Sequence, residues 1–391
     1  MWKTSLWVNL LSLFLENYCN KLDIIFRVDA SVSIGIGHFM RCLALADSFS
    51  KRVCKISFIC RQLPDYLSLV LEDRTYNLVK LVEDESNWTV DNLPHSSWLG
   101  TSQNLDVKAT IAAMGGHCDI LIIDHYGIDS KWEIAIRKWA ACILVIDDLA
   151  DRHHECDILL NQNLYTNPKS RYKNLVSDNC MLLLGPQYAI LRDEFSRVRQ
   201  DIHIKSGVVK RILVLMGGVD RHNITEKVIN SLFMLNHKID VDVDVDVVVG
   251  REHPALESLG ELCSKYKYNF HVQPDNLVML MSMADLAVGS SGSTSWERCC
   301  LGLPTVCLTQ AFNQIEIAEG LAKSGAIINL GDGISIQTTE LCSALEKLIS
   351  EPEKVRDMSK KCLEIVDGLG TQKIFAELVK IKPHGYIDFN N

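Results

Sequence analysis

The residues most clearly suited to chemistry stand near the start of the chain, where Gly35 and Gly37 come just before His38. An apolar run ends near Val28, and an amphipathic pattern over 39–49 follows, so the glycines occupy a turn between a predicted strand and a predicted helix. The free N–H groups and the dipole of a helix N-terminus favour an anion such as a diphosphate and disfavour an imidazolium. We therefore interpret Gly35 and Gly37 as substrate-binding residues and His38 as a neutral general base.

Two common phosphate-binding motifs do not fit this turn. A dinucleotide-binding turn needs a third glycine where Met40 stands, and a P-loop needs a Gly-Lys-Ser/Thr end that the segment lacks. A helix-capping loop with a surface histidine remains open for so short a motif. The other motifs of the chain decide between these interpretations.

A second strand, loop and helix pattern occurs at residues 286–303, where an apolar run ends in a loop rich in glycine and serine. Ser291, Gly292 and Ser293 belong to this loop, and a helix is predicted to begin near its end. Because parallel sheets bind ligands at the carboxyl ends of their strands, we interpret these residues as an anion-binding loop. Glu297, one turn into the helix, either accepts hydrogen bonds from ribose hydroxyls or balances the helix dipole.

Two further turns carry candidate binding residues. Gly217 and Gly218 follow an apolar run, and their flexible backbone allows close approach to a phosphate or a sugar. Asn223 stands at the start of the next predicted helix, where ligand contact and helix capping are both open. Asn313 and Gln314 follow another apolar run, and their amides suit a uracil edge or a phosphate.

Polar residues also follow two apolar runs in the first half of the chain. Asp124, His125 and Tyr126 come after one run, and Asp147 and Asp148 come after the other. Both groups are predicted to lie at the carboxyl edge of a parallel sheet.

Two segments with metal-binding residue types do not have ligand geometry. His153, His154 and Cys156 lack a third, widely separated ligand, and the alternating Asp-Val run at 240–247 lacks the turns and the glycine of a calcium loop. The run instead predicts a strand with an acidic solvent face and a valine core face. We expect neither a metal nor a cofactor.

The elements that carry these motifs alternate between short apolar runs and amphipathic stretches, which indicates parallel sheets flanked by helices. The pattern occurs twice, so the predicted fold class is α/β with two Rossmann-like domains. The predicted strands are 24–28, 55–60, 120–123 and 142–146 in the first series, and 211–216, 241–249, 270–272, 286–288 and 305–308 in the second.

Domain limits follow from the same pattern. The polar, basic segment 195–210 has no clear periodicity and is the best linker candidate. The predicted parts are an N-terminal extension (1–21), a first domain with His38 (22–200), a linker (201–209), a nucleotide-binding domain (210–350) and a C-terminal helix and tail (351–391). The helix in the tail is expected to return to the first domain.

Composition restricts the partners and the compartment. The 391 residues include 40 Lys+Arg and 49 Asp+Glu, a net charge of −9, so no nucleic-acid partner is expected. The 14 cysteines are scattered without a CxxC motif, which is typical of reduced thiols in a cytoplasmic protein. The apolar stretch within residues 1–21 is too short for a membrane span and lacks a signal-peptide cleavage site, although a membrane-associating helix remains an alternative to a plain extension.

Taken in order, the motifs RVDASVSIGIGHFMRC, LIIDHYG, DDLADRHHECDILLNQN, LLGPQYAILRDEF, MGGVDRHN and SGSTSWE resemble the UDP-2,4-diacetamido-2,4,6-trideoxy-β-L-altropyranose hydrolases of pseudaminic acid biosynthesis. The resemblance spans residues 26–330. It implies a hydrolytic relative of GT-B glycosyltransferases, with the nucleotide held mainly by the second domain. It also implies that His38 is the catalytic base, that Tyr126 is an active-site residue, and that Asn223 and Glu297 contact the nucleotide.

The predicted function is therefore hydrolysis of a UDP-linked diacetamido-trideoxy sugar, with inversion at the anomeric carbon and without a metal, in a cleft between the domains. Two alternatives stay open: a GT-B glycosyltransferase that uses a UDP-amino sugar, and a non-catalytic sugar-nucleotide-binding protein. The UDP-sugar is the expected partner. A monomer and the absence of a stable membrane span are the working expectations.

Overall fold

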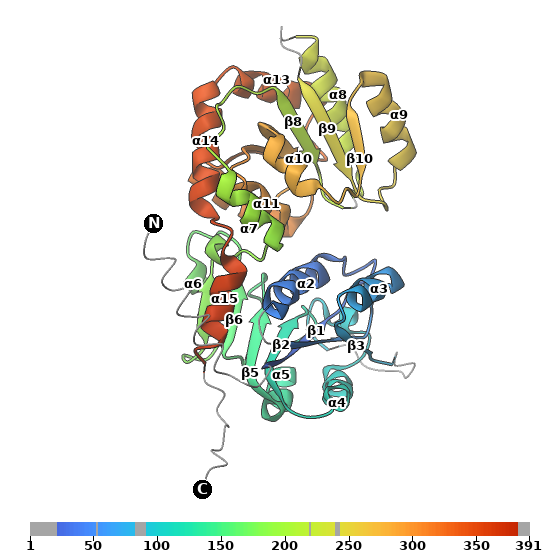
Figure 1. The fold of residues 1–391 in the computed structure, drawn as a ribbon, viewed down its shortest axis with the longest axis vertical. Coiled ribbons are helices and arrows are strands. Elements are labelled where there is room, and N and C mark those ends of the chain that lie inside the picture. Colours follow the sequence, from blue (N-terminus) through green and yellow to red (C-terminus); the bar gives the residue numbers. More distant parts are fainter. Residues whose placement is uncertain (1–21, 52–53, 83–90, 219, 239–242, 382–391) are drawn as a thin grey trace. The chain divides into compact units, whose positions relative to one another are not determined.

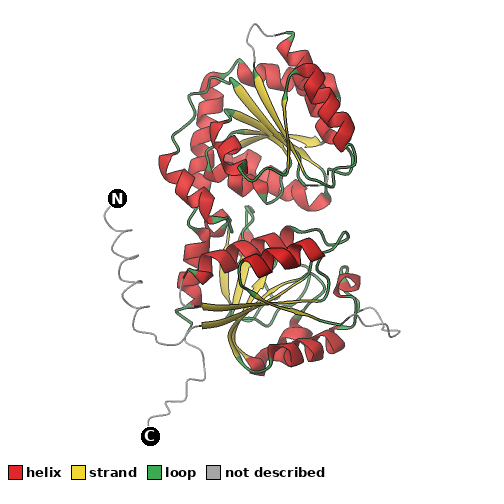
Figure 2. Cartoon of the chain, turned by 45° about the vertical axis from the view of Figure 1, so that its right-hand side comes forward, coloured by secondary structure: helices red, strands yellow, loops and turns green. Residues whose placement is uncertain are grey.

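Apolar runs become parallel strands in both halves of the chain, and helices cover both faces of each sheet (Figures 1 and 2). The computed structural model describes residues 22–51, 54–82, 91–218, 220–238 and 243–381. The predicted extension 1–21 and the first part of the alternating Asp-Val run lie outside these residues. Contacts divide the described chain into unit 1 (22–162, 169–184 and 371–381) and unit 2 (163–168 and 185–370).

Unit 1 contains a seven-stranded parallel sheet in the order β3-β2-β1-β4-β5-β6-β7. Its strands are β1 (Leu22–Val28), β2 (Cys54–Cys60), β3 (Asn77–Lys80), β4 (Cys118–Asp124), β5 (Ala140–Ile146), β6 (Ile158–Asn161) and β7 (Met181–Leu184). Its helical segments are α2 (Gly37–Ser50), α3 (Asp65–Asp73), η1 (Ser96–Leu99), α4 (Gln103–Met114), α5 (Ser130–Ile136) and η2 (Arg137–Trp139), with α6 (Pro168–Arg171) and α15 (Gly370–Leu378) at its boundaries.

Unit 2 contains a six-stranded parallel sheet in the order β10-β9-β8-β11-β12-β13. Its strands are β8 (Arg211–Leu215), β9 (Asp244–Val249), β10 (Asn269–Val272), β11 (Leu286–Gly289), β12 (Thr305–Thr309) and β13 (Ile327–Asp332). Its helical segments are η3 (Pro186–Tyr188), α7 (Asp193–Val198), η4 (Arg199–Asp201), α8 (Ile224–Asn236), α9 (Leu256–Tyr266), α10 (Leu277–Met283), α11 (Thr294–Cys300), η5 (Phe312–Gln314), α12 (Ile315–Ser324), α13 (Thr338–Ile349) and α14 (Pro352–Ile365).

Both sheets have the strand order of Rossmann folds, in which the first strand lies in the middle and the order reverses beside it. The two-domain α/β prediction is therefore confirmed. In unit 1 the ring of Phe26 stacks on Phe58 at 4.8 Å, and Phe39 of α2 packs on Phe58 at 5.7 Å. These aromatic contacts fix α2 against the sheet, and the start of α2 is the part of the helix that carries His38.

The division into units differs from the predicted domain limits. Residues 185–200 belong to unit 2 because Ala189, Leu191 and Phe195 are buried in its core. The predicted linker at 201–209 also packs on unit 2, where the backbone N–H of Lys205 donates to Ser359 Oγ at 2.9 Å. Polar composition and the lack of periodicity suggested a linker, but contacts such as that of Lys205 assign these residues to unit 2.

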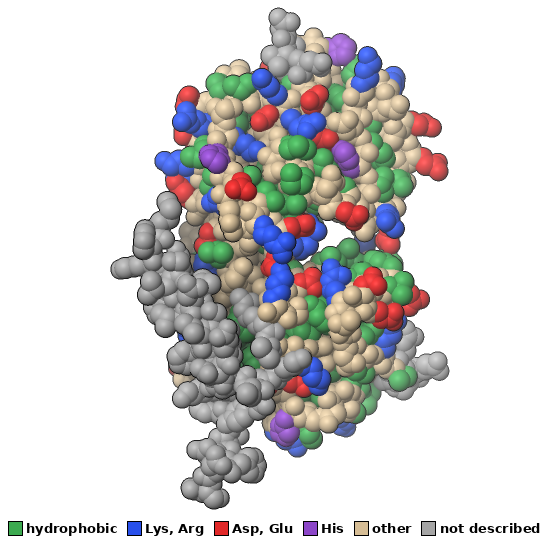
Figure 3. Space-filling view, viewed as in Figure 1, with side chains coloured by type: hydrophobic (Ala, Val, Ile, Leu, Met, Phe, Trp, Pro, Cys, Tyr) green, Lys and Arg blue, Asp and Glu red, His purple; other side chains and the backbone are tan. Residues whose placement is uncertain are grey.

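The C-terminal helix returns to unit 1, where the ring of Phe375 in α15 lies 5.1 Å from that of Phe49 in α2. Residues 382–391 of the predicted tail lie outside the described part of the chain. No described helix combines the length and the apolar composition needed to cross a membrane. On the face drawn in Figure 3, acidic and basic side chains are interspersed rather than gathered by sign.

The acidic solvent face predicted for the alternating Asp-Val run is wrong for the part that the structure describes. Strand β9 includes Asp244 and Asp246, but only Asp244 is exposed, while Asp246 is buried. The carboxylate of Asp246 lies 2.9 Å from Nε2 of His271 and 3.2 Å from Nε of Arg211. Because neighbouring strands supply these two partners, Asp246 is accommodated on a buried strand rather than on a solvent face.

Candidate active site

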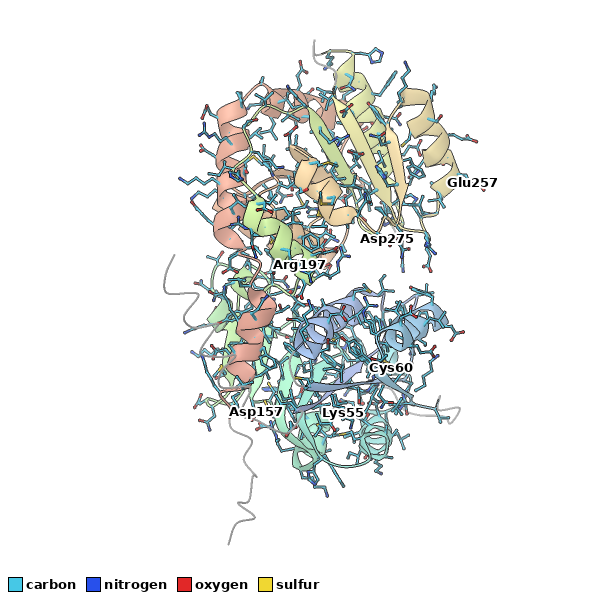
Figure 4. All side chains as sticks on the ribbon, in the orientation of Figure 1. Lys55, Cys60, Asp157, Arg197, Glu257 and Asp275 are labelled. Atoms are coloured by element: carbon cyan, nitrogen blue, oxygen red, sulfur yellow. The ribbon has the colours of Figure 1, made fainter. Side chains whose placement is uncertain are left out.

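The first candidate site lies where the strand order of the unit 1 sheet reverses. Strands β1 and β4 are neighbours there, and Val28 pairs with Asp124 at their carboxyl ends. Figure 4 marks this edge with Cys60, the last residue of β2, whereas Lys55 lies near the opposite end of the same strand. Parallel α/β sheets bind their ligands at such a position. The loops after β1 and β4 therefore carry the side chains of interest.

The loop after β1 forms a closed turn. The backbone N–H of Gly35 donates to the carbonyl of Ser31 at 2.7 Å, and Gly35 has a φ of +79°, which favours glycine. Helix α2 begins at Gly37, so His38 is its second residue, and the predicted apolar face of this helix is buried. The side chain of His38 is 12% exposed, which leaves it accessible from the sheet edge.

The imidazole of His38 is held by a buried carboxylate. Its Nδ1 atom lies 2.6 Å from Oδ1 of Asp124, the last residue of β4, whose side chain is fully buried. Burial alone would raise the pKa of Asp124, but the neighbouring Arg41 and then His38 lower it below its usual range. An ionised carboxylate that accepts the Nδ1 proton leaves Nε2 as the acceptor of the ring. The pair has the geometry of an oriented general base.

Arg41 connects two carboxylates of this site. Its Nε and Nη2 atoms lie 2.5 and 2.7 Å from Asp124, and its Nη1 atom lies 2.5 Å from Asp148. The same Nη2 atom lies 3.2 Å from Nδ1 of His38. Burial opposes the charged guanidinium, but the two carboxylates raise the pKa of Arg41 well above its usual value. This fork fixes Asp124 in the orientation that His38 requires.

Tyr126 lies against His38 at the end of the same strand. The two rings meet edge to face with centroids 4.5 Å apart, and the Tyr126 hydroxyl donates to Asp148 at 2.9 Å. Burial and then Asp148 raise the pKa of Tyr126 well above its usual value. The phenol therefore stays protonated at neutral pH and is a hydrogen-bonding and packing residue rather than a base.

A buried ion network lies beside this site. Arg27 of β1 makes a two-pronged contact with Asp106 of α4 at 3.2 and 2.8 Å, and it lies 2.9 Å from Asp29. Arg61 after β2 reaches the same Asp106 at 3.0 Å, and the indole of Trp132 donates to it at 3.0 Å. These contacts join the ends of β1 and β2 to α4, and so they stabilise the sheet edge that carries His38.

Of the histidines that sequence analysis rejected as metal ligands, His154 has another partner. Nδ1 of His154 lies 2.7 Å from Glu133, and both side chains are buried. Cys156 lies 3.7 Å from Cys180, sulfur to sulfur. No three His, Cys, Asp or Glu side chains of the described residues form a metal-binding group.

The second candidate site lies at the corresponding edge of the unit 2 sheet, where Leu215 of β8 pairs with Gly289 of β11. Asp275, which follows β10, marks this edge in Figure 4. Gly217 after β8 has a φ of +103°, a conformation that favours glycine. A side chain at Gly250, after β9, would collide with the carbonyl of Gly218, so these two loops touch along bare backbone.

Capping of α8 falls to Asp220 rather than to Asn223. The carboxylate of Asp220 accepts from the N–H groups of Ile224 and Thr225 at 3.0 and 2.8 Å. Asn223 stands at the helix start with a φ of +50° and makes no capping bond, while its amide donates to Glu226 at 2.5 Å. Its buried Oδ1 has no hydrogen-bond partner among the described residues. Asn223 therefore does not cap the helix, and its contact with a ligand stays a prediction.

The side chain of Arg298 is only 2% exposed and hydrogen-bonds to the loop after β11. Its Nη2 atom donates to the carbonyl of Ser290 at 2.5 Å and to Ser295 Oγ at 3.1 Å. Burial lowers the pKa of Arg298, which the nearby charge of Glu297 partly opposes, and no ion pair joins Arg298 to a carboxylate of the described residues. This guanidinium therefore places positive charge directly beneath the loop that contains Ser291, Gly292 and Ser293.

Hydrogen bonds join the remaining predicted residues of unit 2. Ser291 Oγ donates to the carbonyl of Gln314 at 2.9 Å, and Gln310 Nε2 donates to the carbonyl of Met216 at 2.7 Å. Asn313, between these contacts in η5, is exposed. The loops after β8, β11 and β12 therefore form one connected rim.

Glu297 lies in the first turn of α11. Burial raises the pKa of Glu297, opposed by the nearby charges of Arg192 and then Arg298. Its carboxyl group has no hydrogen-bond partner among the described residues, so its acceptor positions are open to a ligand.

The predicted residues thus separate into two groups. Gly35, Gly37, His38 and Tyr126 gather at the edge of the unit 1 sheet, and the other predicted residues gather at the edge of the unit 2 sheet. Sequence analysis missed two residues of this site. Arg41 is a polar residue outside the apolar face of the predicted helix, and it contacts Asp124. Trp98 has its ring centroid 6.3 Å from that of His38. A clue to Arg41 was its position three residues after His38, on the same side of a helix.

Two proteins of known name are similar to this chain over most of its length. The UDP-2,4-diacetamido-2,4,6-trideoxy-β-L-altropyranose hydrolase of Campylobacter jejuni is 28% identical over 306 residues, which cover 78% of this chain and 97% of the hydrolase. The spore coat polysaccharide biosynthesis protein SpsG of Bacillus subtilis is 25% identical over 354 residues, 90% of this chain and 96% of SpsG. The chain is a relative of this hydrolase family. The resemblance indicated by its motifs is confirmed.

An uncharacterized protein of Methanocaldococcus jannaschii is 28% identical over 310 residues, and the match covers 77% of this chain but only 58% of that protein. No family model matches the chain.

Solved structures establish the fold. MurG of Acinetobacter baumannii superposes with a TM-score of 0.60 at 13% identity, over 92% of this chain and 99% of its own. The glycosyltransferase of kitacinnamycin superposes with a TM-score of 0.62 at 15% identity, over 93% of this chain and 100% of its own. At these identities the likeness concerns the fold alone, which is of the GT-B type with two Rossmann-like domains.

Proposed function

We propose that this protein hydrolyses a UDP-linked amino sugar to the free sugar and UDP. The observation that carries the proposal is the 2.6 Å contact between His38 Nδ1 and the buried carboxylate of Asp124, which leaves Nε2 of an accessible imidazole as a proton acceptor. The hydrolase name of the Campylobacter jejuni relative supports the reaction. The same name suggests 2,4-diacetamido-2,4,6-trideoxy-β-L-altropyranose as the sugar.

In the proposed reaction, His38 Nε2 takes a proton from water while the water oxygen attacks the anomeric carbon. The bond between that carbon and the β-phosphate oxygen breaks, so UDP departs and the configuration inverts. Asp124 stabilises the imidazolium that forms, and Arg41 keeps Asp124 ionised and aligned. The base is a side chain, so the proposal requires no metal ion. It also requires no strong general acid, because UDP is a good leaving group.

Binding of the nucleotide is assigned in this proposal to the rim of unit 2. The positive charge of Arg298 under the loop after β11 favours a diphosphate, and the open carboxyl group of Glu297 suits the two hydroxyls of a ribose. Asn223 is proposed as a further contact, because its Oδ1 has no hydrogen-bond partner among the described residues. Gly217, Gly218, Asn313 and Gln314 are proposed to complete the contacts with the nucleotide.

The test is incubation of the purified protein with a UDP-linked diacetamido-trideoxy sugar in ¹⁸O water, without any acceptor. Release of UDP, with the label in the sugar, supports attack of water at the anomeric carbon. Label in the nucleotide would overturn the proposed attack, and UDP release only after addition of an acceptor would overturn hydrolysis.

A glycosyltransferase is the second candidate, because the solved structures of the same fold include the glycosyltransferase of kitacinnamycin. Fold alone does not decide between water and another acceptor. The labelling experiment separates the two candidates, because a hydrolase releases UDP without an acceptor and a glycosyltransferase needs one.

A further inference from the structure

Three aromatic rings form a surface beside His38 that the proposed reaction does not use. Trp98 lies in η1, and its ring stacks on that of Tyr126 with centroids 5.8 Å apart. His95 packs on both rings, at 4.5 Å from Trp98 and 5.6 Å from Tyr126. We name His95, Trp98 and Tyr126 the aromatic wall. His38 meets this wall at 4.5 Å from Tyr126 and 6.3 Å from Trp98.

The backbone holds the aromatic wall in place. The carbonyl of Trp98 accepts from Nε2 of Gln62 at 3.0 Å, which ties η1 to the loop after β2. A side chain at Gly127 would approach the carbonyl of His95 to 2.9 Å, so the loop after β4 lies directly against η1. The wall is therefore a preformed surface, held in place by the loops after β2 and β4.

Of the polar atoms of the wall, the Tyr126 hydroxyl donates to Asp148, while those of Trp98 and His95 have no such partner in the described part of the chain. The indole N–H of Trp98 and the ring nitrogens of His95 have no hydrogen-bond partner among the described residues, and both side chains are partly exposed. Trp132 of the same unit is different, because it is buried and its indole donates to Asp106 at 3.0 Å. Burial lowers the pKa of His95, so at neutral pH this ring is uncharged. A neutral aromatic surface with a free N–H donor suits an apolar group that carries a carbonyl.

We propose that the aromatic wall is a subsite for an acetamido group of the sugar, and that Trp98 determines specificity for it. The indole N–H of Trp98 donates to the acetamido carbonyl, and the rings of Trp98 and His95 cover the acetamido methyl group. A sugar with a hydroxyl at that carbon is too short to make either contact. The inference rests on the proposed function because it assumes a sugar nucleotide beside His38.

The test measures binding rather than turnover, in the full-length His38→Asn protein, whose slow turnover limits consumption of the substrate during the titration. Calorimetric titrations compare three ligands: the UDP-linked 2,4-diacetamido-2,4,6-trideoxy sugar, a UDP-linked 6-deoxyhexose with hydroxyls in place of both acetamido groups, and UDP. We expect the diacetamido ligand to bind roughly tenfold or more tightly than the hydroxyl ligand. In Trp98→Ala this preference should fall to within about twofold, while the affinity for UDP stays the same. Trp98→Phe, which keeps the packing but lacks the N–H, should retain part of the preference.

Trp139→Ala is the matched control, because Trp139 is another partly exposed tryptophan of unit 1 but ends η2 just before β5, at the opposite edge of the sheet. A preference for the diacetamido ligand that survives Trp98→Ala would overturn the proposal. An equal loss of UDP affinity in Trp98→Ala would also overturn it, since the wall would then bind the nucleotide. Failure of the wild-type protein to release UDP in the labelling experiment would refute hydrolysis but leave this selectivity measurable.

Discussion

The Nδ1 atom of His38, at the start of α2, lies 2.6 Å from the carboxylate of Asp124, at the end of β4. The two residues are 86 positions apart in the chain, and they meet because β1 and β4 are neighbours where the strand order reverses. A histidine held in this way has one defined tautomer and one available nitrogen. The chemistry proposed for the protein depends on this relationship.

Replacement of His38 by asparagine tests the base directly. We expect turnover of the UDP-sugar to fall by at least about a hundredfold, since a positioned base contributes about 10²–10⁴ in rate. Calorimetry should show an unchanged affinity for UDP. His117→Asn is the control, because His117 precedes β4 at the opposite edge of the same sheet. Near-normal turnover of His38→Asn would remove His38 from the mechanism.

Asp124→Asn tests the orienting carboxylate. The amide keeps the size of the side chain but loses the charge that stabilises the imidazolium, so we expect kcat to fall by about 10²–10⁴ with KM changed by less than about threefold. Asp119→Asn is a control on the same strand, where the carboxylate accepts from the backbone N–H of Asp23 at 2.8 Å. Steady-state rates of UDP release decide the question, and equal kcat values for the two variants would show that Asp124 has no role in turnover.

The strands show which part of the fold can be read from the chain. The strands predicted from long apolar runs occur in the structure, because a strand buried on both faces must be apolar along its length. Strands β3, β6, β7 and β13 were not predicted, because the first three have only four residues and the apolar run of β13 is interrupted by Asn329 and ends in Asp332. The limits of the units were misjudged for a different reason, because Phe195 is buried by packing that no local pattern reveals.

The candidate site divides in the same way. His38 was found because glycines and a strand end mark its turn, whereas Arg41 and Trp98 depend on contacts between distant segments. Arg41 reaches Asp148 across 107 positions, and a single polar residue on an amphipathic helix is most often a solvent-exposed one. Likewise, the choice between ligand contact and capping for Asn223 required the position of Asp220. Local motifs locate the loops of such a site, and tertiary contacts determine which side chains work together.

The buried guanidinium of Arg298 leads to a prediction about nucleotide binding. Because no carboxylate of the described chain pairs with it, its charge is available to a diphosphate above the Ser290 carbonyl. We expect Arg298→Gln to weaken UDP binding by about tenfold or more while the affinity for uridine stays the same, since only UDP carries the negative charge. Arg298→Lys, which keeps a charge, should be intermediate. Parallel titrations with the two ligands check this, and an equal loss for both would indicate a purely structural residue.

Asp106 leads to a prediction about stability and its dependence on pH. It lies between Arg27 and Arg61, and Asp106→Asn would leave these buried guanidinium groups short of negative charge. Breaking a buried ion pair by removing one partner costs about 3–5 kcal/mol, so we expect a loss of that order in the free energy of unfolding at neutral pH, measured by urea denaturation. Asp65→Asn, at an exposed ion pair with Lys80, should leave the free energy of unfolding unchanged.

The sign of the pH dependence follows from the direction of the shift. Burial would raise the pKa of Asp106, but Arg27 and Arg61 outweigh it and lower the pKa below the ordinary value. A lowered pKa means that the stabilisation is fully present above the unfolded value of about 3.9 and is lost as the pH falls through the folded value. The difference in stability between the wild type and Asp106→Asn should therefore be constant near neutral pH and shrink below about pH 4. A difference that grew with acidity would contradict the assignment of Asp106 as the ionised centre of this network.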